Sequence, residues 1–349
     1  MGFLKWLAKR AITMAITLVI AVYITVIIAN MGGLVDEIVM KQIEAQVSEM
    51  LRMNPRFMNM TLEEREEYRQ RLIAEQIKAR GLDKPPIIRS FYYLRDALTL
   101  DLGRTGRPFG QRRVWDVIME RLPWSVLLFT TATVINAAIG IPLGLYMGRK
   151  ALSKFDRGMM LFAILTYSLP AWFVGMLLIL VFYFYLGWFP AGQLVSGMYK
   201  SYWTPEAIAD IMWHMALPLM SWVITGFGGW AYTTRNIVIH ITHEDYVLVA
   251  RAKGVPERLI IRRYILRPAA PPIVTMIALA LIGSWGGAII TETVFQWPGL
   301  GQLYWWAIST QEASLVIGIT VIYAYLLVIT VFVLNILYGF LDPRIKAMR

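Results

Sequence analysis

The chain has 349 residues, of which 57% are hydrophobic and 16% are charged, and its formal net charge is +11. Soluble globular chains are less apolar and more charged, so the composition indicates an integral membrane protein and excludes an ordinary soluble domain. The complete lack of cysteine excludes disulfides, thiolate metal sites and thiol catalysis.

Six apolar runs are long enough to cross a hydrocarbon core of roughly 30 Å as helices, and none has a charged residue in its middle. They cover about 11–30, 126–147, 159–186, 214–234, 271–290 and 315–340. The first run is too long for the apolar part of a signal peptide and lacks an A-x-A-like cleavage site, so we expect it to be retained. The predicted fold class is all-α integral membrane, with six transmembrane helices.

Basic residues in the connections predict the orientation of these spans. Lys and Arg gather before span 1, between spans 2 and 3, between spans 4 and 5 and after span 6, whereas the other two short loops hold only Lys200. Because basic loops stay inside, both termini are predicted to be cytoplasmic in a multi-pass protein of the cell membrane. These loops account for most of the net charge, so we expect membrane lipid and no nucleic acid as a partner.

The spans divide the chain into four predicted regions. The long segment between spans 1 and 2 is external, because long loops cross the membrane regardless of their charge. The regions are an N-terminal cytoplasmic end with span 1 at 1–30, an external helical segment at 31–123, a five-span core at 124–340 with a cytoplasmic segment at 236–268, and a cytoplasmic tail at 341–349.

Helical patterns predict three helices in the external segment. Apolar spacing predicts the first over about 35–52. Thr61 and Glu64 have capping-box spacing and begin the second, which Gly81 ends in a left-handed conformation. The third has on one side Ile87, Ile88, Phe91, Tyr92 and Leu98. This apolar side fits a membrane interface, another protein, or the chain's own spans.

Small residues and prolines mark the membrane runs. Two glycine series recur every four residues and predict close approach of a neighbouring helix. They are Gly140, Gly144 and Gly148 in span 2, and Gly283 and Gly287 in span 5. The apolar runs also contain Pro142, Pro170 and Pro218. Proline lacks the amide donor of a helical hydrogen bond, so we expect kinks at these positions. Kinked helices with glycine faces suit a protein that rearranges.

Several kinds of chemistry are excluded by what the sequence lacks. It has no GxxxxGK[ST] phosphate loop, and His243-Glu244 does not extend to HExxH, so no catalytic or metal-binding residues are expected. Neutral spans argue against a proton-driven carrier, although sodium sites built from carbonyl groups stay open. A transporter powered from outside its own chain remains.

The basic block between spans 4 and 5 predicts two short helices. Thr242 and Asp245 have capping-box spacing ahead of a helix to about Lys253, which Gly254 ends, and Pro256 begins the second. The second helix mixes apolar residues with Arg, so we expect it to lie on the bilayer surface.

Small residues mark the corner between these two helices. Ala250, Ala252 and Gly254 would let a soluble partner approach closely there. The alternative interpretation of this block is a cytoplasmic loop that is basic because of its orientation and binds no partner.

The run EDYVLVARAKGVPERLIIRRYILRP in this block resembles the coupling segment of permeases of binding-protein-dependent ABC importers, of the dipeptide and oligopeptide type. Further stretches agree with that family in order: LDLGRTGRP, VIMERLPWSVLL, YSLPAWFVGMLLILVFYFYLGWFPAG, ETVFQWPGLGQL and LYGFLDPRIK. The resemblance covers about 87–346. It implies a type I importer fold, with an extra first span and a coupling helix seated in a cleft of a soluble ATPase.

The resemblance also implies a set of residues that couple to the ATPase. They are Glu244, Asp245, Tyr246, Ala250, Arg251, Ala252, Lys253, Gly254, Val255 and Pro256. The family signature has Glu-Ala-Ala, three residues and Gly; Leu248 and Val249 replace its first two residues, whereas Ala250 and Gly254 match. The external helices exceed the family's usual segment.

The predicted function is therefore a permease subunit of an ATP-driven importer, and not an enzyme. It implies a second homologous permease, two ATPase subunits that bind ATP and Mg²⁺, an external solute-binding protein, and no cofactor in this chain. Oligopeptides are the favoured solutes, with oligosaccharides such as cello-oligosaccharides, or nickel, as alternatives. Two other classes are an ion-coupled secondary carrier and a non-transporting membrane scaffold.

Three aromatic residues are candidates for the substrate path. They are Tyr167, Trp172 and Trp285. Their flat faces would suit sugar rings as readily as peptide side chains, but the ordinary role of such residues in membranes is interface anchoring or packing.

Overall fold

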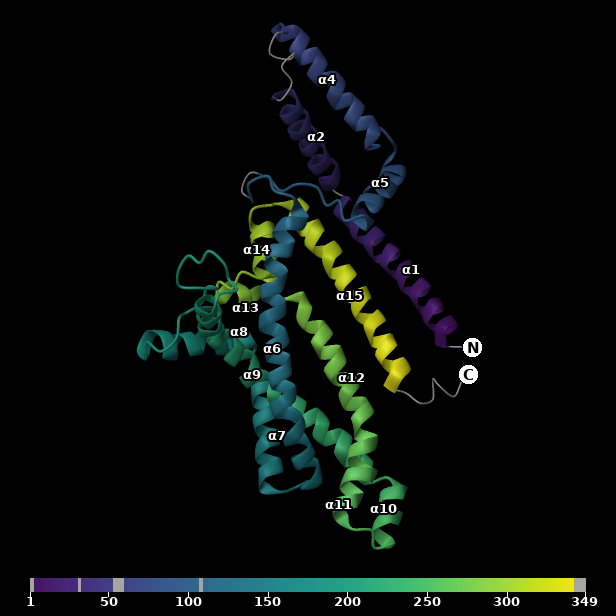
Figure 1. Ribbon diagram of the computed structural model, residues 1–349, viewed down its shortest axis with the longest axis vertical. Helices are drawn as coiled ribbons and strands as arrows, with labels where there is room; N and C mark the ends of the chain where they lie inside the picture. Colours follow the sequence, from purple (N-terminus) through teal and green to yellow (C-terminus); the bar gives the residue numbers. More distant parts are fainter. Residues whose placement is uncertain (1–2, 31–32, 53–59, 107–108, 342–349) are drawn as a thin grey trace. The chain divides into compact units, whose positions relative to one another are not determined.

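The computed structural model describes residues 3–30, 33–52, 60–106 and 109–341, and within these ranges the chain is helical, with one isolated β-bridge and no strand (Figure 1). The predicted tail 341–349 lies outside the described residues except for its first position. The α-helices are α1 (Phe3–Asn30), α2 (Leu34–Arg52), α4 (Leu62–Ala79), α5 (Pro86–Leu98), α6 (Val114–Arg149), α7 (Lys154–Tyr167), α8 (Ala171–Leu178), α9 (Pro205–Thr242), α10 (Asp245–Ala252), α11 (Glu257–Leu259), α12 (Arg267–Gly283), α13 (Ile289–Val294), α14 (Leu300–Ser309) and α15 (Ala313–Leu341). Two π-helical stretches, Ile179–Tyr185 and Ile260–Leu266, follow α8 and α11, and a 3₁₀ turn, Ser284–Gly286, follows α12.

The described residues contain five helices that are long and apolar enough to cross a membrane, and a sixth span if one bent pair is counted. The five are Ala8–Ile28, Val114–Arg149, Pro205–Thr242, Glu257–Gly286 and Ala313–Ile336. The bent pair is α7 with α8 and its π-helical extension. The prediction of an all-helical integral membrane protein is confirmed, and the predicted number of six spans is reached if the bent pair forms one span.

The third predicted span, at 159–186, is not one straight helix. α7 ends at Tyr167 and the next helix begins after Pro170, with a bend of 92° between them. Proline disfavours a helical conformation of the residue before it, here Leu169, and the Pro170 carbonyl accepts the amides of Phe173 and Val174 in the first turn of α8. The predicted disruption at Pro170 is confirmed, whereas α6 and α9 continue through Pro142 and Pro218.

The chain forms two compact units, which are described separately. Unit one is made of Arg121–Gln302 with the described parts of 1–7 and 330–349, and unit two of Ala8–Glu120 with Leu303–Ile329. The core of unit one surrounds Phe295 and Trp297, both fully buried, together with Leu128 and Leu217.

Glycines allow α6 and α9 to approach closely within unit one. A Cβ at Gly140 or Gly144 would overlap the backbone of α9, and one at Gly148 would lie 2.6 Å from the Val238 Cβ. The predicted glycine contact of span 2 is therefore confirmed. The predicted contact of span 5 is present only in part: α12 ends at Gly283, whose Cβ position has no described atom within 4 Å, whereas Gly287 lies in the turn beyond, with a φ of +69°, and its Cβ position is 3.2 Å from the Ser125 Oγ of α6.

Unit two holds α1 from Ala8 onward and the helices of the segment that is predicted to be external, α2, α4 and α5. Thr61 and Glu64 make the predicted capping box at the start of α4. Gly81 has a φ of +70° after α4, and the Leu82 amide bonds the Ile77 carbonyl, which is the Schellman arrangement. Buried Ile43, Val47 and Leu51 of α2 pack on Ile73 of α4. The two helices thereby form a hairpin.

Candidate functional site

The residues of the predicted coupling segment form a corner at the end of α9, and we call residues 244–256 the α10 corner. α9 has 38 residues, which is roughly 57 Å at 1.5 Å per residue, against a hydrocarbon core of roughly 30 Å. The helix is therefore longer than the hydrocarbon core is thick. Figure 1 shows α10 and α11 together at this far end, where α9 leads into them and α12 leads away.

The start of α10 differs from the predicted capping box. Thr242 is the last residue of α9, and its hydroxyl donates to the Val238 carbonyl at 2.7 Å. The cap of α10 is Glu244, which makes no side-chain capping bond. The Thr242 prediction is wrong because α9 continues further than the apolar pattern indicated, so the hydroxyl is used inside that helix.

Gly254 ends α10 as predicted. Its φ is +73°, its amide bonds the Arg251 carbonyl at 2.9 Å, and the Val255 amide bonds the Ala250 carbonyl at 3.1 Å. This is a Schellman motif, in which glycine accepts the left-handed conformation without strain. The turn fixes the angle at which the chain leaves α10.

The inner side of the corner is a small apolar core. Val247 and Ala250 of α10 pack with Val238 of α9 and with Ile260 and Ile265 of the π-helical stretch, and all five are buried. Ala250 is only 4% exposed. Its small side chain therefore leaves room for the chain's own helix, and its predicted role in coupling to the ATPase stays a prediction.

The second predicted helix does not lie on the bilayer as a separate element. Glu257–Gly286 is one helical path in which the π-helical stretch runs directly into α12. Two of its apolar side chains, Ile260 and Ile265, are covered by α9 and α10, which removes the apolar face that a surface helix would need. In the stretch Ile260–Leu266, the mixture of Ile and Arg therefore separates a side that packs on α9 and α10 from a side that is exposed.

The outer side of the corner presents apolar residues beside charged ones. Tyr246 is 42% exposed, and Leu248 and Val249 are each 51% exposed. Desolvation by partial burial, together with the nearby Glu244 carboxylate, raises the pKa of the Tyr246 hydroxyl. Large apolar side chains that are exposed next to a rigid turn fit a protein-docking surface.

Most of the predicted coupling residues lie on this outer side. An ion pair of 3.2 Å between Arg251 and Glu257 joins the two helices of the corner. Val255 is half-buried and Ala250 is buried, whereas the exposed members are Glu244, Asp245, Tyr246, Arg251, Ala252, Lys253, Gly254 and Pro256.

The three candidates for the substrate path lie on different elements of unit one. Tyr167, at the end of α7, is 79% exposed and contacts the position of Gly229 in α9. Trp172 is in α8 with its ring 6.2 Å from that of Phe173, and Trp285 is in the 3₁₀ turn after α12. Their role in a path stays a prediction.

A buried ion pair in unit one was missed by the sequence analysis. Arg235 of α9 donates from Nε and Nη2 to the two oxygens of Asp156 at 2.5 and 2.8 Å, and Asp156 is fully buried. Asp156 also accepts the Leu152 amide. The pair holds the start of α7 on α9, and its two members are too far apart in sequence for a local pattern to join them.

A second missed cluster surrounds Glu292 of α13, which is fully buried. Its carboxylate accepts from the Ser125 hydroxyl at 2.7 Å and the Gln302 amide at 2.9 Å, and Ser125 accepts the Leu300 amide at 2.8 Å. Gly287 and Gly299 leave the space that this arrangement occupies, because a Cβ at either position would meet the Glu292 carboxylate and the Ser125 hydroxyl. The ETVFQWPGLGQL stretch is thus tied to α6. The sequence signal that could have identified this cluster is an acidic residue, Glu292, just beyond an apolar run.

The third polar cluster joins the loop before α9 to that helix. His214 has Nε2 2.9 Å from the Ser196 hydroxyl and Nδ1 2.6 Å from the Gly192 carbonyl. Asp210 accepts from the Ser196 amide and hydroxyl, and from Tyr199. In a hydrolytic triad the carboxylate would bind Nδ1 of the histidine. Here the Asp210 carboxylate accepts from the serine, so the cluster holds the loop before α9 against that helix.

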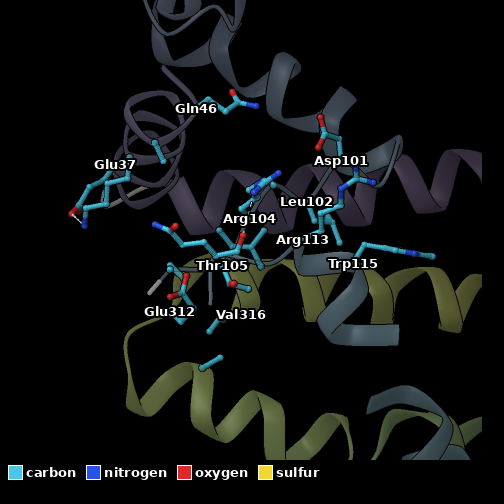
Figure 2. Close-up of a pocket in the computed structure, with 18 of the residues that line it drawn as sticks. Glu37, Gln46, Asp101, Leu102, Arg104, Thr105, Arg113, Trp115, Glu312 and Val316 are labelled. Carbon is cyan, nitrogen blue, oxygen red and sulfur yellow. Dashed lines mark hydrogen bonds and ion pairs between the residues drawn. The ribbon is translucent and has the colours of Figure 1, made fainter. Parts of the chain in front are cut away.

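Unit two has a large groove with lining side chains of both charges (Figure 2). Its volume is about 2220 Å³, and it lies between α2, the segment 99–113 and the turn that leads into α15. Figure 2 shows Glu37 and Gln46 from α2 on one side, with Arg104 and Glu312 on the other. On the predicted orientation this groove opens on the external side of the membrane.

Comparison with known proteins gives one family and several relatives. The family described as "Binding-protein-dependent transport system inner membrane component" matches residues 140–347. The chain is 31% identical over 274 residues to the Oligopeptide transport system permease protein AppB of Bacillus subtilis, covering 77% of this chain and 84% of that protein. It is 30% identical over 290 residues to the Di/tripeptide transport system permease protein DppB of Pseudomonas aeruginosa, covering 79% and 85%. It is 33% identical over 282 residues to the Inner membrane ABC transporter permease protein YejB of Escherichia coli O157:H7, covering 78% and 76%.

Proposed function

Because the chain belongs to the binding-protein-dependent transport system inner membrane component family, we propose that it is the permease subunit of an ATP-driven importer of oligopeptide-class solutes. It is a multi-pass transport subunit that works with a solute-binding protein and ATPases. In the proposed assembly it pairs with a second homologous permease and two ATPase subunits, which bind ATP and Mg²⁺. Both termini lie in the cytoplasm, and the hydrolytic chemistry lies outside this chain.

The observation that carries the coupling role is the exposed outer side of the α10 corner. Tyr246, Leu248 and Val249 present apolar surface at the end of a helix that is longer than the hydrocarbon core is thick. Leu248 and Val249 are also the positions at which this chain departs from the family signature. We assign them to the contact with a cleft of the ATPase, where their size sets which ATPase fits.

The inner side of the same corner supports the transmission of force. The Val247 and Ala250 core joins α10 to α9 and to the helix that becomes α12, and the Arg251–Glu257 pair joins the two helices of the corner. A displacement of α10 therefore moves both spans rather than bending the loop alone. Such rigid-body movement suits alternating access driven by ATPase closure.

Charge substitution on the outer side tests this assignment. Val249→Asp places a carboxylate in the proposed contact without entering the apolar core, because Val249 is exposed. We expect about tenfold or more weaker association with the ATPase subunits, the effect of losing one interface hot spot, and a matching loss of ATP-driven uptake in proteoliposomes. Leu62→Asp is the matched control, since Leu62 is an exposed apolar residue of α4. Normal ATPase copurification with Val249→Asp would remove the corner from the contact.

The solute class is inferred from the relatives. Their names specify oligopeptide and di/tripeptide transport, and the spans of this chain offer aromatic side chains that also suit sugar rings. Calorimetric titration of the copurifying solute-binding protein with short peptides, cello-oligosaccharides and nickel decides between them. We expect micromolar peptide binding. Binding of sugar or nickel without a response to peptides would change the assigned solute from oligopeptides to sugar or nickel. It would leave the permease assignment intact.

The groove of unit two is the proposed seat of the solute-binding protein. Its lining side chains carry both charges, which favours a polar partner, and such contacts mainly set association rate and orientation. Glu44→Lys in the groove should slow binding-protein association several-fold at low salt, with less effect at high salt. Glu63→Lys is the control, because Glu63 is exposed on α4 and does not line the groove. Equal rates for both variants would place the docking site elsewhere.

A further inference from the structure

The exposed side of α5 is apolar although the helix already has a buried side. Ser90, Tyr93, Leu94 and Ala97 are buried on the inner side of α5. On the other side Ile87 is 74% exposed, Ile88 48% and Phe91 56%. The described part of unit two places no side chain over these three residues that would bury them.

Contacts with α1 set the depth of α5 relative to the membrane. Val22 and Val26 of α1 share a core with the buried residues of α5, and the Tyr23 hydroxyl lies 3.2 Å from the Ser90 hydroxyl. The rings of Tyr23 and Phe91 stack at 5.4 Å. Tyr23 lies seven residues before the end of α1 at Asn30, which is roughly 10 Å along the helix axis.

α1 is itself a membrane-spanning helix whose apolar side chains are exposed. In its half nearest α5, the large apolar residues with exposed side chains are Val19, Ile20, Ile24, Ile27 and Ile28. Phe91 stacks on Tyr23, within this stretch, so the exposed side of α5 is continuous with the lipid-facing surface of α1. A helix that lies in the membrane interface buries its apolar face by about 5–10 Å, and the depth of Phe91 agrees with this.

We propose that α5 is an interfacial helix whose Ile87, Ile88 and Phe91 side chains lie in lipid at the end of α1 that leads to α2. The charged residues of α5 fit this position. Arg89 bonds Asp36 at 2.7 Å on the α2 side, and Arg95 pairs with Asp96, so neither guanidinium needs to enter the hydrocarbon core.

The interfacial position has a consequence for the external helices. Arg89 and Tyr93 of α5 both bond the Asp36 carboxylate in the first turn of α2, at 2.7 and 2.5 Å. A helix fixed in the interface therefore fixes the base of the α2–α4 hairpin at the membrane surface. This role is independent of ATPase coupling and of the solute class.

Spin labelling of the cysteine-free chain tests the proposal. Single cysteines replace Ile87 or Ile88 in the full complex in liposomes, and the label's accessibility to oxygen, which partitions into lipid, is compared with its accessibility to a water-soluble nickel chelate. Ile24→Cys in α1 is the lipid control. Leu62→Cys in α4, which is 82% exposed, is the water control.

The labels at 87 and 88 should resemble the label at 24, with oxygen accessibility exceeding that of the chelate. Accessibility like that of position 62 would show that α5 faces water. Low accessibility to both reagents would show that another protein covers the helix. Either result overturns the proposal, and neither depends on transport or ATPase binding, so the proposed function is tested separately.

Discussion

At the scale of single residues, buried polar side chains make the most specific contacts. Glu292 lies in an apolar surrounding, where an unpartnered carboxylate would be strongly disfavoured, and it is retained because the Ser125 hydroxyl and the Gln302 amide bond it. Glu292 is therefore one of the contacts that hold the ETVFQWPGLGQL stretch on α6, together with the bond from the Trp297 indole to the Trp124 carbonyl.

Removal of this carboxylate should destabilise the folded complex. In Glu292→Ala the Ser125 hydroxyl and the Gln302 amide lose their acceptor while remaining buried, and each buried unsatisfied group costs about 1–3 kcal/mol. We expect a lowered midpoint of thermal unfolding in detergent. Glu206→Ala, in the exposed first turn of α9, is the control and should leave the midpoint nearly unchanged. An unchanged midpoint for Glu292→Ala would contradict the structural role.

Ala250 illustrates how one position can match a signature for a reason other than contact with a partner. Ala250→Leu adds volume to the closed core of the corner, and overpacking of this kind costs about 1–3 kcal/mol. Ala252→Leu, two residues away on the exposed side, should change stability by less than about 0.5 kcal/mol. Thermal unfolding of the two variants gives the comparison, and equal midpoints would argue against a buried Ala250.

At the scale of elements, the glycine face of α6 sets the distance to α9. A Cβ on Gly144 would overlap the Ala231 carbonyl oxygen, so even Gly144→Ala should force the helices apart and destabilise the protein. Gly158→Ala in α7 is the matched control, because nothing lies within 4 Å of its Cβ position. That control should gain about 0.4–1 kcal/mol from reduced freedom of the unfolded chain. Opposite shifts in unfolding temperature are the expected result, and two shifts of the same sign would contradict it.

The helix ends show which local signals determine element boundaries. The capping box at Thr61 and the left-handed glycines at 81 and 254 each act within one turn of chain, and the structure has all three. The Thr242 pattern had the same form, but α9 continued past it. A capping pattern therefore marks a helix start only where the preceding chain is not already helical.

At the scale of the whole molecule, the topology has a direct test in the cysteine-free chain. Cysteines at exposed positions should react with an impermeant thiol reagent from outside at Ser201 and Thr310, and only after membrane disruption at Ala151 and Glu257. Reversed labelling would place the α10 corner outside the cell and end its assignment to a cytoplasmic ATPase.

The sequence by itself determined the class of protein, the approximate positions of the apolar helices and the existence of the corner. Each of these depends on a signal that is local along the chain: apolar length against bilayer thickness, and turn residues at a fixed spacing. The family could also be read from ordered motifs, and the comparisons confirm it. The roles of the coupling and path residues stay predictions.

Only the tertiary structure decided which side of each element is covered. Ala250 turned inward and Leu248 outward, although both are near neighbours on one short helix, because the position of Ile260 and Ile265 selects the buried side. The Arg235–Asp156 and Ser125–Glu292 contacts join residues that are 79 and 167 positions apart. No local pattern links such residues, since only the packing of separate helices brings them within hydrogen-bonding distance.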